Sequence, residues 1–157
     1  MQLVIELERD PATRRRLQEA LTARLPQWFG QDEPNRHYAA EAERLEGWVA
    51  RVDGQPAGLI LLRGHSAEQA EIHWLGVDPA HHRKGIGRAL VAAVERRVRA
   101  ERMRVLLVTT LHADVDYEPY RRTRSFYEAL GFEYASSTRE GSAGPTSDPL
   151  ACYRKAL

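Results

Sequence analysis

The sequence predicts one α/β domain over residues 1–157, built on a single mixed sheet of about seven strands with helices on its faces. Three observations carry this prediction. The chain has 157 residues, a length that fits one domain with a full core. Short apolar runs alternate along it with stretches of helical periodicity. Hydrophobic residues make up 43% and charged residues 29%, as in ordinary globular proteins.

The first half of the chain is expected to form four strands and two helices. Asp10-Pro11 supplies an N-cap followed by proline at the first helical position, and Pro26 ends that helix. Asp53-Gly54 is a strong hairpin signal between two apolar runs. Strands are expected at residues 2–8, 48–52, 57–62 and 70–77. Helices are expected at residues 11–25 and, with a weaker pattern, 35–45.

The second half is expected to add two helices and three strands. Leu90, Val94 and Val98 recur one helical turn apart, and Gly131 follows the last helix as a C-terminal cap. The run at residues 105–108 is apolar on both faces, as in a central strand covered on both sides. Helices are expected at residues 85–102 and 118–130, and strands at 104–110, 132–134 and 150–155. An acidic loop is expected at residues 111–119 and a Ser/Gly/Pro-rich loop at 136–149.

Composition excludes several classes of function. The net charge is +1, from 23 Lys+Arg against 22 Asp+Glu, so no whole-protein field attracts nucleic acid or a membrane surface. The one cysteine, Cys152, excludes an internal disulfide and fits a reducing compartment. No apolar stretch approaches the roughly 20 residues that span a bilayer, and the N-terminus lacks the features of a signal peptide. A cytoplasmic protein without nucleic-acid or membrane partners is expected, as a monomer or a homodimer.

A basic, glycine-containing loop at residues 81–88 joins the strand at 70–77 to the next helix. A helix N-terminus leaves backbone N–H groups unpaired, and these groups attract anions. Gly85 and Gly87 let the backbone approach a bulky ligand because no Cβ stands in the way. Arg83, Lys84 and Arg88 add positive charge at the same place. The loop is therefore interpreted as a cradle for a pyrophosphate, against the alternative of a solvated basic turn.

Two familiar phosphate motifs do not fit this loop. A dinucleotide fingerprint needs a third small residue three positions after Gly87, where Leu90 stands. A Walker loop needs Gly-Lys followed by Ser or Thr, which the chain does not contain. The sequence Arg-Lys-Gly-Ile-Gly-Arg-Ala-Leu, after a strand ending in Val-Asp-Pro, instead resembles the acyl-CoA-binding segment of the GCN5-related N-acetyltransferases (GNAT).

A second motif supports the same resemblance. Residues 123–132, Thr-Arg-Ser-Phe-Tyr-Glu-Ala-Leu-Gly-Phe, are similar to a later helix of that family, and one strand separates the two motifs as expected. The predicted element order fits the family over nearly the whole chain. The resemblance implies a mostly antiparallel sheet that is splayed between its fourth and fifth strands. A generic α/β domain with a glycine turn is the structural alternative.

The resemblance implies acetyl-CoA as co-substrate, bound between the splayed strands. Pantetheine is then expected to pair with the backbone of Leu75, Gly76 and Val77. The pyrophosphate is expected on the loop, at His82, Arg83, Lys84, Gly85, Ile86, Gly87 and Arg88. The chain departs from the family at His82, where Gln or Arg is common, and at Leu111-His112, where an Asn often follows the strand. The backbone N–H donors of the loop do not depend on the side chain at His82, whereas both changes alter the side chains that the family offers to the cofactor.

Acetyl transfer to an amine needs a base, an oxyanion donor and an acid for the leaving thiol. Tyr127 stands at the acid position that the resemblance implies, and a strand N–H near Val77 at that of the oxyanion donor. A phenol is protonated at neutral pH and can donate to sulfur. Glu71 and His73 are candidate bases on one face of a strand, acting directly or through water. Their structural alternatives are a core-edge tyrosine, a surface glutamate and a packing histidine.

Other candidate sites carry weaker signals. His73, His81 and His82 have no second cluster with metal-ligand spacing, so no metal is expected. The arginine-rich stretch at residues 96–102 also carries acids and an apolar stripe, which favours a solvated helix face over nucleic-acid binding. Ser125 has no visible histidine–acid partners for a nucleophile. Substrate-facing candidates, each with a plain structural alternative, are Asp114, Asp116, Glu118, Trp28 and Phe29.

The leading hypothesis is an N-acetyltransferase that acetylates a small-molecule amine by direct attack in a ternary complex. A non-catalytic acyl-CoA-binding module predicts the same cofactor but no release of thiol. A protein acetyltransferase, acting on an N-terminus or a lysine, predicts a groove of peptide width in place of a closed pocket.

Overall fold

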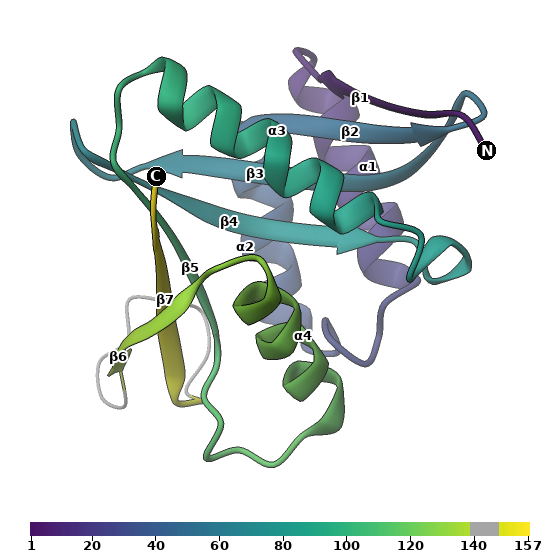
Figure 1. Cartoon of the computed structure of the whole chain (residues 1–157). Helices are drawn as coiled ribbons and strands as arrows, with labels where there is room; N and C mark the ends of the chain where they lie inside the picture. The colour runs from purple at the N-terminus through teal and green to yellow at the C-terminus, as the bar shows by residue number, and fades with distance from the viewer. Residues whose placement is uncertain (139–147) are drawn as a thin grey trace.

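The computed structural model describes residues 1–138 and 148–157 and confirms the α/β fold with one mixed sheet (Figure 1). The strands are β1 (Leu3–Leu7), β2 (Glu46–Val52), β3 (Gln55–Gly64), β4 (Gln69–Val77), β5 (Val105–Leu111), β6 (Glu133–Thr138) and β7 (Leu150–Ala156). The helices are α1 (Pro11–Ala23), α2 (Asp32–Ala42), α3 (Ile86–Ala100) and α4 (Glu118–Ala129), with a short 3-10 turn at Pro79–His81. The sheet order is β1-β2-β3-β4-β5-β7-β6, and among these described strands only the β4–β5 pair is parallel.

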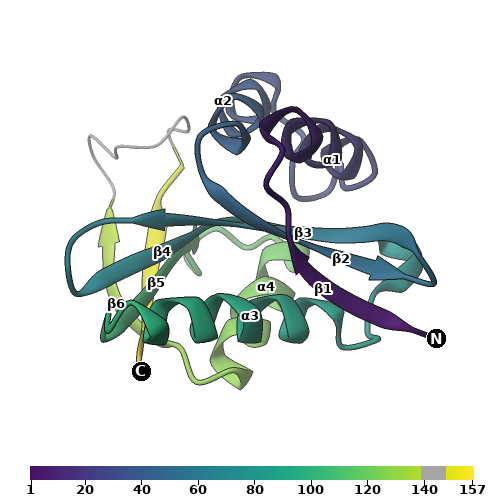
Figure 2. The same ribbon diagram turned by 90° about the horizontal axis from the view of Figure 1, so that it is seen from above.

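Helices cover both faces of the sheet. Figure 2 shows α1 and α2 on one face and α3 and α4 on the other. Strand β3 is apolar on both faces for this reason: Ile60 packs into the core beneath α3, whereas Leu59 and Leu61 pack into the smaller core beneath α1 and α2. The predicted stripe of α3 is confirmed, since Leu90 and Val94 are fully buried in the larger core.

The predicted boundaries differ from the structure by no more than two residues, except at α2 and β6. Helix α2 begins at Asp32, three residues before the predicted start, because Pro34 lies in the first turn, where no N–H donor is needed. Strand β6 runs from Glu133 to Thr138, pairing with β7 across a bulge, so it extends into the predicted loop at 136–149. The core of that loop, residues 139–147, lies outside the described residues. Phe132, predicted to start the strand, is instead a core residue just before it.

Strands β4 and β5 pair only at their beginnings, as the resemblance to the family implied. The parallel register runs from Gln69↔Val105 to Ile72↔Val108 and then stops. Beyond this point β4 keeps its partner β3 on one side, but its other edge is open. The open edge faces the gap between the two halves of the sheet.

A β-bulge at His73 reverses the faces of β4 at the start of this gap. Leu62 pairs with Ile72 and Leu61 with Trp74, so His73 is the extra residue. Ile72 packs into the core beneath α3, whereas Trp74, two residues later, packs into the core beneath α1 and α2. The bulge therefore brings His73 and Trp74, one after the other, to the α2 side of the sheet. No feature of the sequence predicted it.

Arg14 is a buried arginine of α1 that joins three segments of backbone. Its Nε donates to the Ala42 carbonyl at 2.8 Å, and its terminal nitrogens donate to the carbonyls of Glu8 and Glu43, each at 3.0 Å. Two of these carbonyls belong to the C-terminal end of α2, where helix geometry leaves acceptors unpaired. A Cβ at Gly47 would lie 2.9 Å from the Arg14 Cδ, so glycine there leaves room for this side chain.

We expect Arg14→Met to lower the free energy of unfolding by about 3 kcal/mol, because buried carbonyls lose their charged donor. Urea denaturation followed by circular dichroism measures the change as a shift of the midpoint at constant slope. Arg16→Met is the matched control on the same helix, because Arg16 is exposed and bonds only to the Thr13 hydroxyl among the described residues. Equal midpoints for the two variants would contradict the assigned role.

Candidate active site

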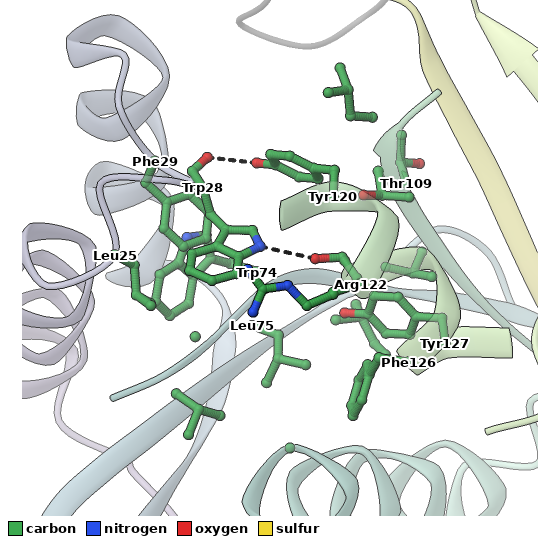
Figure 3. Close-up of a pocket in the computed structure, with 18 of the residues that line it drawn as sticks. Leu25, Trp28, Phe29, Trp74, Leu75, Thr109, Tyr120, Arg122, Phe126 and Tyr127 are labelled. Atoms are coloured by element: carbon green, nitrogen blue, oxygen red, sulfur yellow. Dashed lines mark hydrogen bonds between the residues drawn. The ribbon is translucent and has the colours of Figure 1, made fainter. Parts of the chain in front are cut away.

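A cavity of about 1350 Å³ occupies the gap between β4 and β5 and reaches both faces of the sheet. Residues from the α1–α2 connection, α2, the second half of β4, the loop at 81–88, the end of β5 and α4 line it (Figure 3). Such a cavity exceeds the usual range of about 300–1,000 Å³ for a single small-molecule site. The volume suits a long ligand together with a second, smaller one.

The loop after β4 has the backbone geometry of an anion site. Arg83 and Gly85 both adopt left-handed conformations, with φ of 62° and 79°. Across the described ranges, no carbonyl or side chain accepts a hydrogen bond from the N–H groups of residues 83–88. Asp78 holds the start of the loop, accepting from the Ala80 N–H at 2.9 Å and pairing with the Arg24 Nε at 2.8 Å. The prediction of unpaired donors at the start of α3 is confirmed.

Unlike residues 83–88, His82 is bound to the backbone on both its N–H group and its side chain. Its N–H donates to the Pro79 carbonyl at 3.3 Å, and its Nε2 lies 2.7 Å from the Val77 carbonyl oxygen. The imidazole thus ties the loop to the end of β4. Its ring also meets Trp28 edge-on, with centroids 5.8 Å apart. A direct contact between His82 and a nucleotide stays a prediction.

The open edge of β4 presents backbone groups of alternate residues. The Asp78 N–H donates to the Ala57 carbonyl of β3 at 2.8 Å. Because alternate residues of a strand point their N–H and C=O groups to the same side, those of Gly76 also face β3. Leu75 and Val77 therefore turn their N–H groups toward the gap, with the Val77 carbonyl taken by His82. Gly76 serves the site in another way: a Cβ there would lie 2.3 Å from the Trp74 ring, so glycine lets the indole lie across the strand.

Tyr127 lies on α4 and points into the cavity (Figure 3). Its ring is 4% exposed and packs edge-on against Phe126 and Phe132, with centroids 5.0 and 5.4 Å away. The hydroxyl makes no hydrogen bond to any residue that the structure describes. Burial raises the pKa of Tyr127, so the phenol keeps its proton at neutral pH. The residue is thus both a core aromatic and a proton donor facing the cavity.

Glu71 and His73 both line the α2 side of the cavity, but their surroundings differ. The Glu71 carboxylate is in short contact with the His65 Nε2, and its side chain is 16% exposed. The His73 ring packs against Tyr38 and His37, with centroids 5.1 and 6.0 Å away. Its Nε2 is buried and finds no partner among the described residues. Burial, helped by the positive charge of Arg63, lowers the pKa of His73 to about 4.

The low pKa of His73 gives the protein a pH-dependent stability. In the unfolded chain the imidazole takes up its proton near pH 6.5, whereas in the folded protein it stays neutral down to about pH 4. Stability is therefore full above pH 6.5 and falls as the pH drops through this window, because the unfolded chain binds the extra proton. Between pH 7.5 and pH 5 we expect this residue to account for about 2 kcal/mol of lost stability.

Urea denaturation of the wild type and His73→Gln at pH 7.5 and pH 5 isolates this contribution. The variant is expected to lose about 2 kcal/mol less than the wild type over the same interval. Carboxylates titrate in both proteins and cancel in the comparison. Parallel losses in the two proteins would show that His73 does not titrate in the predicted way.

Trp28 forms a bridge across the cavity to α4, which the sequence did not predict. Its Nε1 donates to the Pro119 carbonyl and the Thr123 hydroxyl, both at 3.1 Å. In return the Tyr120 hydroxyl donates to the Trp28 carbonyl at 2.6 Å (Figure 3). The Tyr117 hydroxyl donates to the neighbouring carbonyl of Gln27, also at 2.6 Å. This Trp28 bridge joins elements on opposite faces of the sheet where the β4–β5 ladder is missing.

The other residues that the sequence suggested for substrate binding have partners within the protein. Phe29 lines the cavity and stacks on Trp74, with centroids 5.1 Å apart. The acids at the start of α4 and in the loop before it do not line the cavity: Asp116 pairs with Arg121 at 2.5 Å and Glu118 pairs with Arg122 at 2.7 Å. Within the described ranges, no group of three His, Cys, Asp or Glu residues has the arrangement of a metal site. No helix in the same ranges has the length and apolarity needed to cross a membrane.

Comparisons with known proteins agree with this geometry. A model of the acetyltransferase (GNAT) family matches residues 4–132. The chain is 34% identical over 126 residues to a mycothiol acetyltransferase from Acidothermus cellulolyticus, an alignment covering 76% of this chain and 33% of that relative. The chain thus spans about a third of the length of this curated relative.

Solved structures share the fold at low identity. A GNAT-family protein from Desulfovibrio desulfuricans superposes with a TM-score of 0.81 at 21% identity, covering 99% of both chains. A GNAT family acetyltransferase from Elizabethkingia anophelis with acetyl-CoA bound gives a TM-score of 0.71 at 15% identity, covering 99% of this chain and 98% of that one. Since the family model spans most of the sequence and these structures share its whole fold, the chain belongs to the GNAT acetyltransferase family.

Proposed function

We propose that the protein is an acetyl-CoA-dependent N-acetyltransferase that acetylates a small-molecule amine in a ternary complex. The observation that carries this proposal is one continuous cavity. It joins the unpaired N–H groups of residues 83–88, the open edge of β4, the Tyr127 hydroxyl and the Glu71 carboxylate. The similarity to a mycothiol acetyltransferase supports acetyl transfer.

The residues present fit a CoA thioester. The N–H groups of residues 83–88 suit its pyrophosphate, because a helix N-terminus and left-handed turns concentrate partial positive charge. Val77 offers its N–H group to an amide of a pantetheine arm lying along β4. Gly87 leaves room beside Phe126, whose ring would lie 3.1 Å from a Cβ at that position. When bound, the thioester supplies an activated acetyl group.

Glu71 is the proposed base and Tyr127 the proposed acid. Glu71 takes a proton from the acceptor ammonium, which frees the nitrogen to form its bond to the acetyl carbon as the carbon–sulfur bond breaks. Tyr127 donates its proton to the leaving sulfur, whose own affinity for a proton rises in the same buried site. The second proton, which the nitrogen loses as it becomes an amide, returns to the Tyr127 oxygen. The Leu75 N–H, which is nearer to Glu71 than the Val77 N–H is, is the proposed donor to the negative charge that develops on the carbonyl oxygen. His73 is the less suitable base, because its Nε2 is buried and its ring packs against Tyr38.

Two features favour a small acceptor over a protein. The Trp28 bridge ties the α1–α2 connection to α4 beside the cavity, and a peptide lying between these elements would need them to be apart, as in an open groove. Aromatic side chains from α2, β4 and the α1–α2 connection line the cavity together with Glu71. No Ser or Cys is activated for an acyl-enzyme among the described residues lining the cavity, which favours direct transfer.

Two measurements test the proposal. Acetyl-CoA at 100 times its dissociation constant is expected to stabilise the protein by about 2.7 kcal/mol, visible as a rise in melting temperature. A thiol-reactive dye is then expected to report CoA release only when an amine is added. Absence of any thermal shift would refute the cofactor. A shift without thiol release over a broad amine panel would favour a non-catalytic acyl-CoA-binding module.

A further inference from the structure

The end of the cavity near Glu71 is built differently from the end near residues 83–88. Along β4 the two ends, Glu71 and Val77, are about 20 Å apart at roughly 3.3 Å per residue. The end at residues 83–88 is rich in unpaired N–H groups and cationic side chains. If a CoA thioester occupies that end and the open edge of β4, the space near Glu71 is left for the acceptor.

This acceptor end is lined by rings from three elements. Phe29 stacks on Trp74, and Tyr38 lies against His73, each pair with centroids 5.1 Å apart. The His37 ring lies beside Tyr38, with its centroid 6.0 Å from that of His73. Aromatic faces bind flat apolar groups and also attract ammonium cations. The bulge at His73 places the rings of His73 and Trp74 on the side of β4 that faces α2.

The charged side chains at the acceptor end favour a cationic ligand over an anionic one. Glu71 faces the cavity and keeps one oxygen in contact with His65. Arg63, a cation lining the same end, is bound to the Glu41 carboxylate at 3.0 Å. His73 adds no positive charge, because burial lowers its pKa to about 4. A cationic amine at this end is therefore attracted by the Glu71 carboxylate. A carboxylate on the acceptor is repelled by Glu71, and the nearby cation, Arg63, already pairs with Glu41.

We propose that the acceptor is a primary amine on a compact aromatic body without a carboxylate group. This inference rests on the proposed function and assigns its substrate class. The ammonium lies toward Glu71, and the aromatic body lies among the rings of Phe29, Tyr38 and Trp74. Amino acids are disfavoured because their carboxylate is repelled by Glu71, and polyamines because they have no flat apolar group to bury against the rings.

Calorimetric titration of the full chain, with and without saturating CoA, tests the class by binding alone. 2-Phenylethylamine and L-phenylalanine form a matched pair that differs by one carboxylate, and spermidine tests a polar polyamine. 2-Phenylethylamine is expected to bind at least tenfold more tightly than either competitor. Equal or tighter binding of L-phenylalanine or spermidine, or no binding of 2-phenylethylamine, would overturn the inference.

Two variants link the preference to the proposed residues. Phe29→Leu keeps apolar volume but removes a ring, and it is expected to weaken 2-phenylethylamine binding several-fold without changing that of butylamine. Glu71→Gln is expected to reduce the tenfold preference over L-phenylalanine to less than threefold. Unchanged preferences in both variants would place the amine elsewhere. Selective amine binding without CoA release in the thiol assay would uphold the ligand class while refuting the enzymatic function.

Discussion

Replacing Tyr127 by phenylalanine is expected to lower kcat about a hundredfold or more while leaving acetyl-CoA binding within twofold. Removal of a general acid typically reduces a rate by about 10²–10⁴-fold. The ring of Tyr127 packs between Phe126 and Phe132, and phenylalanine preserves those contacts. Because the hydroxyl has no partner among the described residues, its loss leaves no buried group unpaired. Steady-state kinetics of thiol release, together with calorimetric titration of acetyl-CoA, measures the two effects separately.

A matched control keeps this result interpretable. Tyr134→Phe makes the same chemical change on an exposed side chain of β6 outside the cavity, and its kinetics are expected to equal those of the wild type. The melting temperature of Tyr127→Phe is expected to stay within a few degrees of the wild type. Full activity in Tyr127→Phe would assign protonation of the thiol to water or to another group.

Replacing Gly85 by valine is expected to weaken acetyl-CoA binding at least tenfold. Gly85 caps α3 with a φ of 79°, a conformation that costs a β-branched residue roughly 1–2 kcal/mol. To relieve that strain the loop has to change its backbone angles, which reorients the N–H groups of residues 83–88. The dissociation constant for acetyl-CoA, measured by calorimetry at constant ionic strength, reports the change.

Gly54→Val separates this effect from general strain. Gly54 lies in the β2–β3 hairpin with a φ of 84°, and in both glycines an added Cβ meets no atom within 4 Å. The two variants are therefore expected to lose similar stability in urea, on the order of 1–2 kcal/mol. Only Gly85→Val is expected to lose affinity for acetyl-CoA. Equal affinities in the two variants would mean that the loop does not hold the cofactor.

Local patterns in the sequence predicted most of the elements correctly. The proline after Asp10, the Asp53-Gly54 turn and the leucine and valine stripe of α3 each act within a few residues, so their effect can be read locally. The errors have local causes as well. Pro34 conceals the true start of α2, and β6 is lengthened by pairing with β7 rather than by its own composition.

The site was predicted less completely, because it is assembled from distant segments. The sequence marked Glu71, His73 and Tyr127, but not how their surroundings differ. Burial lowers the pKa of His73, and the contact with His65 orients Glu71; both effects come from packing. The Trp28 bridge joins residues more than 90 positions apart, and nothing near Trp28 in the sequence points to α4.

The sequence by itself determined the α/β element order, the glycine loop that opens α3 and the family to which the chain belongs, since these depend on residue type and short-range spacing. Only the tertiary structure decided which faces and edges are available. The bulge at His73 turns β4 over, and the end of pairing after Ile72 opens its edge to the cavity. A strand shows period-two alternation in its sequence whether or not a neighbour pairs with it or a bulge interrupts it. Those outcomes depend on the packing of the whole sheet against four helices, and that packing is where the cavity arises.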